Sequence, residues 1–115
     1  MSPDILKFLH DIDQACELLR QFTIEKTVDE FRNDAQLRSA VERQFITIGE
    51  ALQQALRLEP GLSNSITDCR RIINFRNVMV HGYAQVSADI VWGVVETGLP
   101  TLAEQVRGLL ADADK

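Results

Sequence analysis

Residues 69–85 read CRRIINFRNVMVHGYAQ, and this segment decides how the rest of the chain is interpreted. Its apolar residues recur at the three- and four-residue spacing of an amphipathic helix, and Gly82 follows as an expected C′ residue. Ser65, with Asp68 three residues later, predicts the start of that helix. Arg76 falls on the apolar face, where a charged guanidinium is costly to bury without partners. The segment therefore predicts a core helix that also carries chemistry.

Further polar residues lie close to Arg76 in this segment. Asn77 and His81 are four residues apart and share one side of the helix, whereas Arg76 and His81 are about 140° apart around an ideal helix. His81 falls in the last turn, where the helix dipole favours a cationic imidazolium that exchanges a proton near neutrality. Tyr83 follows the expected helix end, so its hydroxyl should reach solvent. Alone, Arg76 fits a buried ion pair and His81 a dipole cap; together the residues favour proton transfer beside an anion-binding group.

Two long helices are predicted before this segment. The first begins after Ser2, which is followed by proline at the first helical position. The second is capped by Asn33 or Asp34 and ends at the EPG of residues 59–61. Between them, TVDE at residues 27–30 matches a capping box and predicts a short helix or turn.

A last long helix is predicted after the segment, starting at Ser87. Its apolar stripe stays in phase across Pro100, which predicts a kinked but continuous helix. Gly49 lies inside an earlier helix, where a close approach of another helix would explain it. Four long amphipathic helices and a short one, joined by short links, predict an all-α up-and-down helical bundle. Residues 1–115 are expected to form one domain.

The charge and cysteine content limit the classes of function. A net charge of −5 argues against coating nucleic acid by bulk electrostatics, although Arg70, Arg71 and Arg76 could form a local basic patch. Arg70 and Arg71 could contact an RNA backbone or the acidic surface of a second subunit. Cys16 and Cys69 are isolated and expected in the core, and the chain start lacks signal-peptide features, which predicts a cytoplasmic protein. No apolar run is long enough to span a membrane.

Three other residues stand out: Glu50 and Trp92 have two interpretations each, and His10 has one. Glu50 is either a solvated glutamate or a partner for Arg76 across the bundle. Trp92 is expected in the core, with an anchor in a protein interface as the alternative. His10, among polar neighbours, is expected at the surface.

The octet RNVMVHGY at residues 76–83 resembles, position for position, the R-x-x-x-x-H-x-Y signature of HepT-like proteins, a branch of the HEPN superfamily of small helical ribonuclease toxins. Other matching stretches are LHDI at 9–12, FRNDAQLRSAVERQ at 31–44, Arg43 and IGEA at 48–51, DIVW at 89–92 and LPTL at 99–102. The similarity thus covers nearly the whole chain, and the octet with its flanking elements is far more specific than an R-x-x-x-x-H pattern alone.

This resemblance implies a HEPN-like helical bundle that forms a homodimer and cleaves RNA, such as tRNA or mRNA, without a metal or other cofactor. It implies that Arg76 and His81 are the catalytic residues. It also implies a partner, a minimal nucleotidyltransferase antitoxin, that inhibits the toxin by adding AMP to Tyr83. The added phosphate would place negative charge and bulk at the mouth of the site.

Chemistry gives a reason for the homodimer. RNA cleavage through its own 2′-hydroxyl needs a base, an acid and a cation, and one chain offers a single well-placed histidine, His81. A two-fold dimer would supply the second, while Arg76 holds the phosphate and Asn77 orients the imidazole or the phosphate. The alternative is a catalytically silent helical adaptor, or a nucleotide-binding module, that only partners the nucleotidyltransferase. The acidic composition favours this alternative.

Overall fold

The computed structural model describes residues 1–81 and 86–115, so Gly82 and Tyr83, with the roles predicted for them, lie outside the described residues. The α-helices are α1 (Pro3–Thr23), α2 (Val28–Asn33), α3 (Ala35–Leu58), α4 (Cys69–His81), α5 (Ala88–Gly93) and α6 (Leu99–Ala113). A 3₁₀ helix, η1 (Pro60–Asn64), precedes α4, and a π-helical segment, η2 (Val94–Gly98), joins α5 to α6. The described residues contain no strand, and the predicted all-α fold is confirmed.

The helix starts predicted in the N-terminal half are confirmed because side-chain caps fix them locally. The Ser2 hydroxyl accepts a backbone N–H in the first turn of α1. Thr27 and Glu30 satisfy each other's backbone N–H groups in a capping box at the start of α2. Of the two candidates for α3, Asp34 rather than Asn33 is the cap. Each cap supplies an acceptor that the helix itself lacks.

The start of α4 differs from the prediction: Ser65 does not cap it. The N–H of Ser65 instead donates to the carbonyl of Leu62, which continues the preceding 3₁₀ turn. Asp68 then adopts a left-handed conformation with φ of 60°. The α-helical pattern begins only beyond it, where Ile72 donates to the Asp68 carbonyl at 3.0 Å. Because a left-handed residue cannot lie inside an α-helix, α4 begins at Cys69.

The last helical segment runs without a break from α5 to α6, as predicted, and widens just before Pro100. Proline lacks a backbone N–H, and its ring would collide with the carbonyl four residues earlier in a regular α-helix. In η2 the N–H of Leu99 donates to the carbonyl of Val94, five residues back. This wider turn accommodates the proline inside one continuous helix.

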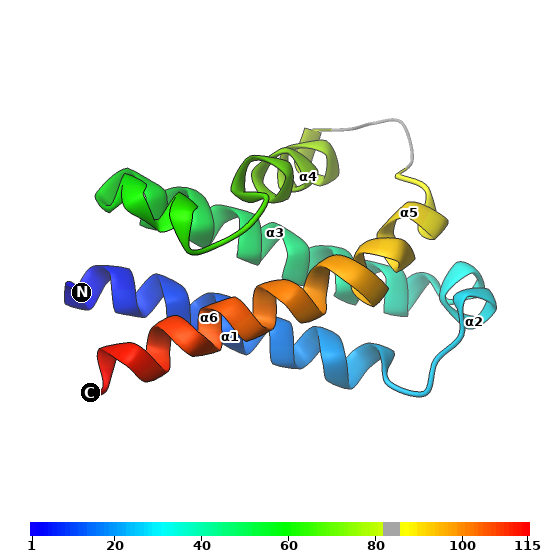
Figure 1. The fold of residues 1–115 in the computed structure, drawn as a ribbon. Coiled ribbons are helices and arrows are strands. Elements are labelled where there is room, and N and C mark those ends of the chain that lie inside the picture. Colours follow the sequence, from blue (N-terminus) through cyan, green and yellow to red (C-terminus); the bar gives the residue numbers. More distant parts are fainter. Residues whose placement is uncertain (82–85) are drawn as a thin grey trace.

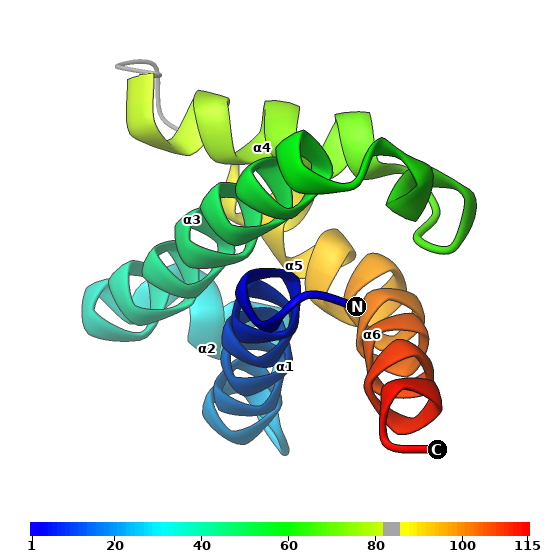
Figure 2. The same cartoon turned by 90° about the vertical axis from the view of Figure 1, so that its left-hand side faces the viewer.

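Three long helical segments lie alongside one another, and α4 crosses them. In Figure 1, α1, α3 and α6 run from side to side across the picture, whereas α4 is seen nearly end-on. Figure 2 shows α4 lying across α3. The fully buried large side chains that fill the space between the helices include Leu9, Ile12, Leu19, Phe31, Ile48, Leu52, Val91 and Val106. Within the described ranges, no helix combines the length and apolarity that crossing a membrane requires. The crossing places α4 at the outside of the bundle, with one side against α3.

Candidate active site

Arg76 lies where α4 packs closely against Gly49 of α3. A Cβ atom built on Gly49 would overlap the Cβ of Arg76 and lie 2.7 Å from its Cγ. Glycine is therefore the residue that lets the stem of Arg76 pass over α3 at this distance. The close helix approach predicted at Gly49 is confirmed, and it is Arg76 that occupies the space.

Two neighbours hold the guanidinium of Arg76. Its Nη2 donates to Oε1 of Glu50 at 3.1 Å, and its Nη1 donates to Oδ1 of Asn77 at 2.8 Å. The Arg76 side chain is only 20% exposed, against 51% for Glu50. Of the two interpretations of Glu50, the partner of Arg76 is the one observed. Since Glu50 is half exposed, solvent screens the pair, and its main effect is to orient the guanidinium.

The Nε of Arg76 is buried and has no hydrogen-bond partner among the described residues. Arg76 also lines a surface hollow of about 320 Å³ between α1, α3 and α4, together with Asp11, Glu50 and the Phe8 ring. Two carboxylates thus face the same hollow as the guanidinium. A phosphate that approached Arg76 from this hollow would meet Glu50 as a competitor for the same donor.

His81 and Asn77 occupy another side of α4. His81 is exposed in the last turn of the helix, four residues after Asn77. Arg76 is five residues before His81, so the two side chains leave an ideal helix about 140° apart and about 7.5 Å along its axis. Asn77 lies between these directions and contacts Arg76. Within one chain, the predicted residues therefore share one helix, but the arginine and the histidine side chains point to different sides of it.

The other predicted residues are placed as expected. Cys16 and Cys69 are buried, and burial raises the pKa of the Cys16 thiol to about 12 and that of Cys69 above its ordinary value. Such thiols stay protonated at neutral pH and do not act as nucleophiles. Trp92 is 9% exposed and packs against Phe31 with ring centroids 5.2 Å apart, which confirms it as a core residue. His10 is exposed.

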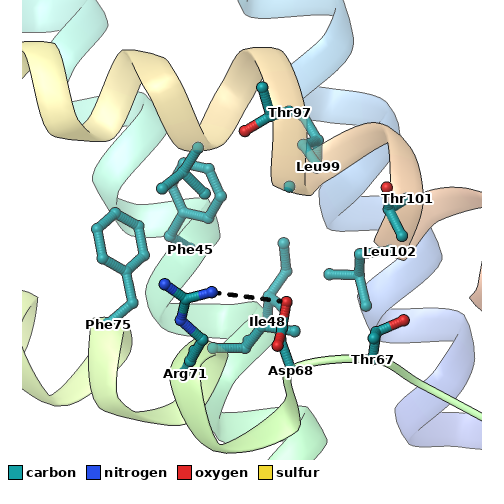
Figure 3. A pocket seen from close by; sticks show the side chains of 13 residues that line it. Phe45, Ile48, Thr67, Asp68, Arg71, Phe75, Thr97, Leu99, Thr101 and Leu102 are labelled. Atoms are coloured by element: carbon teal, nitrogen blue, oxygen red, sulfur yellow. Dashed lines mark ion pairs between the residues drawn. The ribbon is translucent and has the colours of Figure 1, made fainter.

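A pocket of about 370 Å³ lies on the opposite flank of α4, between α3, η2 and α6. Figure 3 shows Phe45, Phe75 and Leu99 along its apolar wall and Arg71 at its rim, where the guanidinium pairs with Asp68 at 3.9 Å. The sequence did not predict this pocket, because three segments far apart in the chain form it and none has a distinctive pattern there.

Comparison with known proteins gives a family match over most of the chain. A family model described as "Ribonuclease HepT-like" matches residues 12–109. No solved structure matches the chain.

Curated relatives include three archaeal proteins. A Methanocaldococcus jannaschii protein named "Gamma-glutamylcyclotransferase and putative RNase" is 28% identical over 115 residues, covering 100% of this chain and 51% of the relative. A second protein of that organism, named "Putative RNase", is 26% identical over 113 residues, covering 96% and 91%. "Probable ribonuclease HepT" of Thermococcus cleftensis is 30% identical over 99 residues, covering 83% and 86%. The chain thus spans about half the length of the first relative and most of the other two.

Proposed function

We propose, because the chain belongs to the HepT-like ribonuclease family, that it cleaves RNA and is the toxin of a toxin–antitoxin pair. The observation that carries the proposal is the placement of Arg76 and His81. A guanidinium held by Glu50 and Asn77 shares a helix with an exposed histidine. We also propose that residues 1–115 form one domain, since one hydrophobic core includes side chains from α1, α3 and α6.

The proposed reaction uses the 2′-hydroxyl of the RNA as its nucleophile. A neutral imidazole of His81 takes the hydroxyl proton as the oxygen attacks the adjacent phosphorus, and an imidazolium returns a proton to the departing 5′-oxygen. Arg76 stabilises the charge that gathers on the phosphate oxygens in the transition state. Asn77, which contacts Arg76, orients the guanidinium relative to the imidazole. No step requires a metal ion.

A homodimer completes this site. One imidazole cannot be base and acid in the same step, and a two-fold axis beside the C-terminal end of α4 would bring a second His81 to the cleft. Val78 is 50% exposed and lies three residues before His81, so the two side chains share one side of α4. A second copy of α4 packed on this side would cover the valine. The exposed valine therefore supports a dimer contact beside the histidine.

Regulation by a nucleotidyltransferase antitoxin is proposed at Tyr83, two residues after His81. Transfer of AMP to the tyrosine hydroxyl would form a phosphodiester and release pyrophosphate from ATP. The added phosphate would repel an RNA phosphate near His81 and fill part of the cleft. We propose that the antitoxin silences the nuclease in this way.

The central experiment incubates the purified protein with tRNA and with total RNA in EDTA, beside a His81→Ala variant. Intact mass first establishes that Tyr83 carries no AMP. We expect the wild type to cut RNA and the variant to be inactive while still folded and dimeric. Size-exclusion chromatography with light scattering checks the dimer, and circular dichroism checks the fold.

Each other result has a defined meaning. Equal cutting by the His81→Ala variant would show that another group is the general base. Loss of cutting in EDTA, restored by magnesium, would contradict metal-independent cleavage. No cutting by the unmodified wild type would favour the silent adaptor of the nucleotidyltransferase over the nuclease.

A further inference from the structure

The side of α4 that carries His81 continues as a polar stripe toward the start of the helix. Its members are Arg70, Asn74, Asn77 and His81, spaced by four, three and four residues. This spacing keeps side chains on one side of an α-helix. Arg70 and Asn74 are exposed and Asn77 is partly buried. The stripe therefore offers one polar path over the whole length of α4.

Arg70 stands at the far end of this path. It precedes His81 by eleven residues, which corresponds to about 16 Å along the helix axis. That distance is too long for the phosphate held at the histidine and suits a phosphate several nucleotides away. On a protein with a net charge of −5, one arginine beside the path has a larger effect on where RNA lies than it would on a basic surface.

Arg71 does not belong to the stripe, although it is the next residue. Its side chain leaves the helix toward the apolar pocket beside η2 and α6, and it pairs with Asp68 (Figure 3). It is 84% exposed, and Arg70 is exposed too, so both charges are available to bulk ions. The two arginines thus carry the same charge on the same helix, but their side chains leave α4 on different sides.

A second surface hollow adjoins Arg70. It has a volume of about 400 Å³ and lies between the end of α3, η1 and the start of α4. Leu56 and Ile73 give it an apolar floor, while Ser63 and Asn74 place a hydroxyl and an amide at its edge. An apolar floor beside groups that donate and accept hydrogen bonds suits a nucleobase.

We propose that Arg70 and this hollow form a nucleotide subsite, in which Arg70 binds a backbone phosphate of the substrate RNA and Asn74 contacts the base. The inference rests on the proposed ribonuclease function and extends it to the path of the substrate along α4. In the dimer, the two copies of Arg70 flank the central pair of His81 side chains. The subsite makes cleavage of a long RNA more efficient than cleavage of a dinucleotide.

Arg70→Ala tests the subsite, and Arg71→Ala is the matched control because it removes the same charge from the neighbouring position. For single-stranded RNA of mixed sequence, we expect Arg70→Ala to raise KM by roughly 3- to 10-fold with kcat unchanged. A plot of the logarithm of the binding constant against the logarithm of salt concentration should become less steep, its slope falling in magnitude by about one. Arg71→Ala should leave both near wild type. Asn74→Ala should also weaken RNA binding, as Arg70→Ala does. A dinucleotide substrate should respond to none of these changes.

Binding and cleavage separate this inference from the function on which it rests. Affinities are measured by fluorescence anisotropy in the His81→Ala background, where RNA stays intact. Equal effects of Arg70→Ala and Arg71→Ala, or an unchanged KM in Arg70→Ala, would overturn the subsite. RNA binding that depends on Arg70 without any cleavage by the wild type would support the subsite and contradict the nuclease. An absence of both cleavage and RNA binding would overturn both.

Discussion

Replacing Gly49 with alanine tests whether the packing of α4 on α3 is as close as described. The new Cβ would overlap the Cβ of Arg76 and lie 2.7 Å from its Cγ, well inside the 3.4 Å at which ordinary contact begins. Because the Arg76 Cβ is bonded to the backbone of α4, a change of rotamer cannot remove the overlap. The two helices must move apart, or one of them must bend.

The expected cost follows from two opposing effects. Added volume in a close contact typically costs about 1–3 kcal/mol, whereas alanine in place of glycine stabilises a helix by about 1 kcal/mol. Since backbone must move, the cost lies toward the upper end. The net destabilisation of Gly49→Ala is then about 1–2 kcal/mol, which corresponds to a fall in Tm of about 4–8 °C for a chain of this size.

Gly108→Ala is the matched control for this measurement. Gly108 lies in α6, is exposed, and a Cβ there would meet nothing within 4 Å. Only the helix propensity remains, so this variant should gain up to about 1 kcal/mol and raise Tm. Thermal and urea unfolding followed by far-UV circular dichroism measure both variants. If Gly49→Ala raised Tm as Gly108→Ala does, the close approach at Arg76 would be refuted.

Glu50→Gln keeps an acceptor for Arg76 but removes the negative charge that competes with an RNA phosphate. KM for RNA should therefore fall by roughly 3- to 10-fold in steady-state assays. An increase in KM would contradict this competition. Hydrogen bonds from Arg20 lower the pKa of Glu17 from 4.5 to about 2. The stabilisation from that carboxylate should be complete above pH 4.5 and be lost as the pH falls toward 2, so urea unfolding of Glu17→Gln should approach wild type in acid. Burial holds the pKa of Cys16 near 12, so thiol reagents should label it only after unfolding; rapid labelling of the folded protein would show that the residue is accessible.

The sequence predicted the parts of the fold that depend on neighbouring residues. The caps at Ser2, Thr27 and Asp34 act within one helical turn, so their patterns can be recognised without knowing the rest of the fold. The start of α4 was predicted wrongly at Ser65 because the left-handed turn at Asp68 has no distinct local pattern. Its serine-and-aspartate spacing resembles a cap that the chain does not use.

The candidate site was partly predictable for the same reason. Arg76 on an apolar stripe indicated a functional charge, since such a position needs specific partners. Whether Glu50 was one of them depended on how α4 crosses α3, which the sequence left open. The different directions of Arg70 and Arg71 also became clear only once α4 was placed between a hollow on one flank and a pocket on the other.

The contact of Arg76 with Gly49 affects the choice of an inactive protein for studies of complexes. Arg76 is a packing element between two helices as well as a charged group, so its truncation would leave a gap beside Gly49 and loosen α4. His81 is exposed at the end of α4, and its removal leaves no gap in the core. A His81 variant is therefore the better bait for trapping uncut RNA or a partner protein, because it presents the native surface.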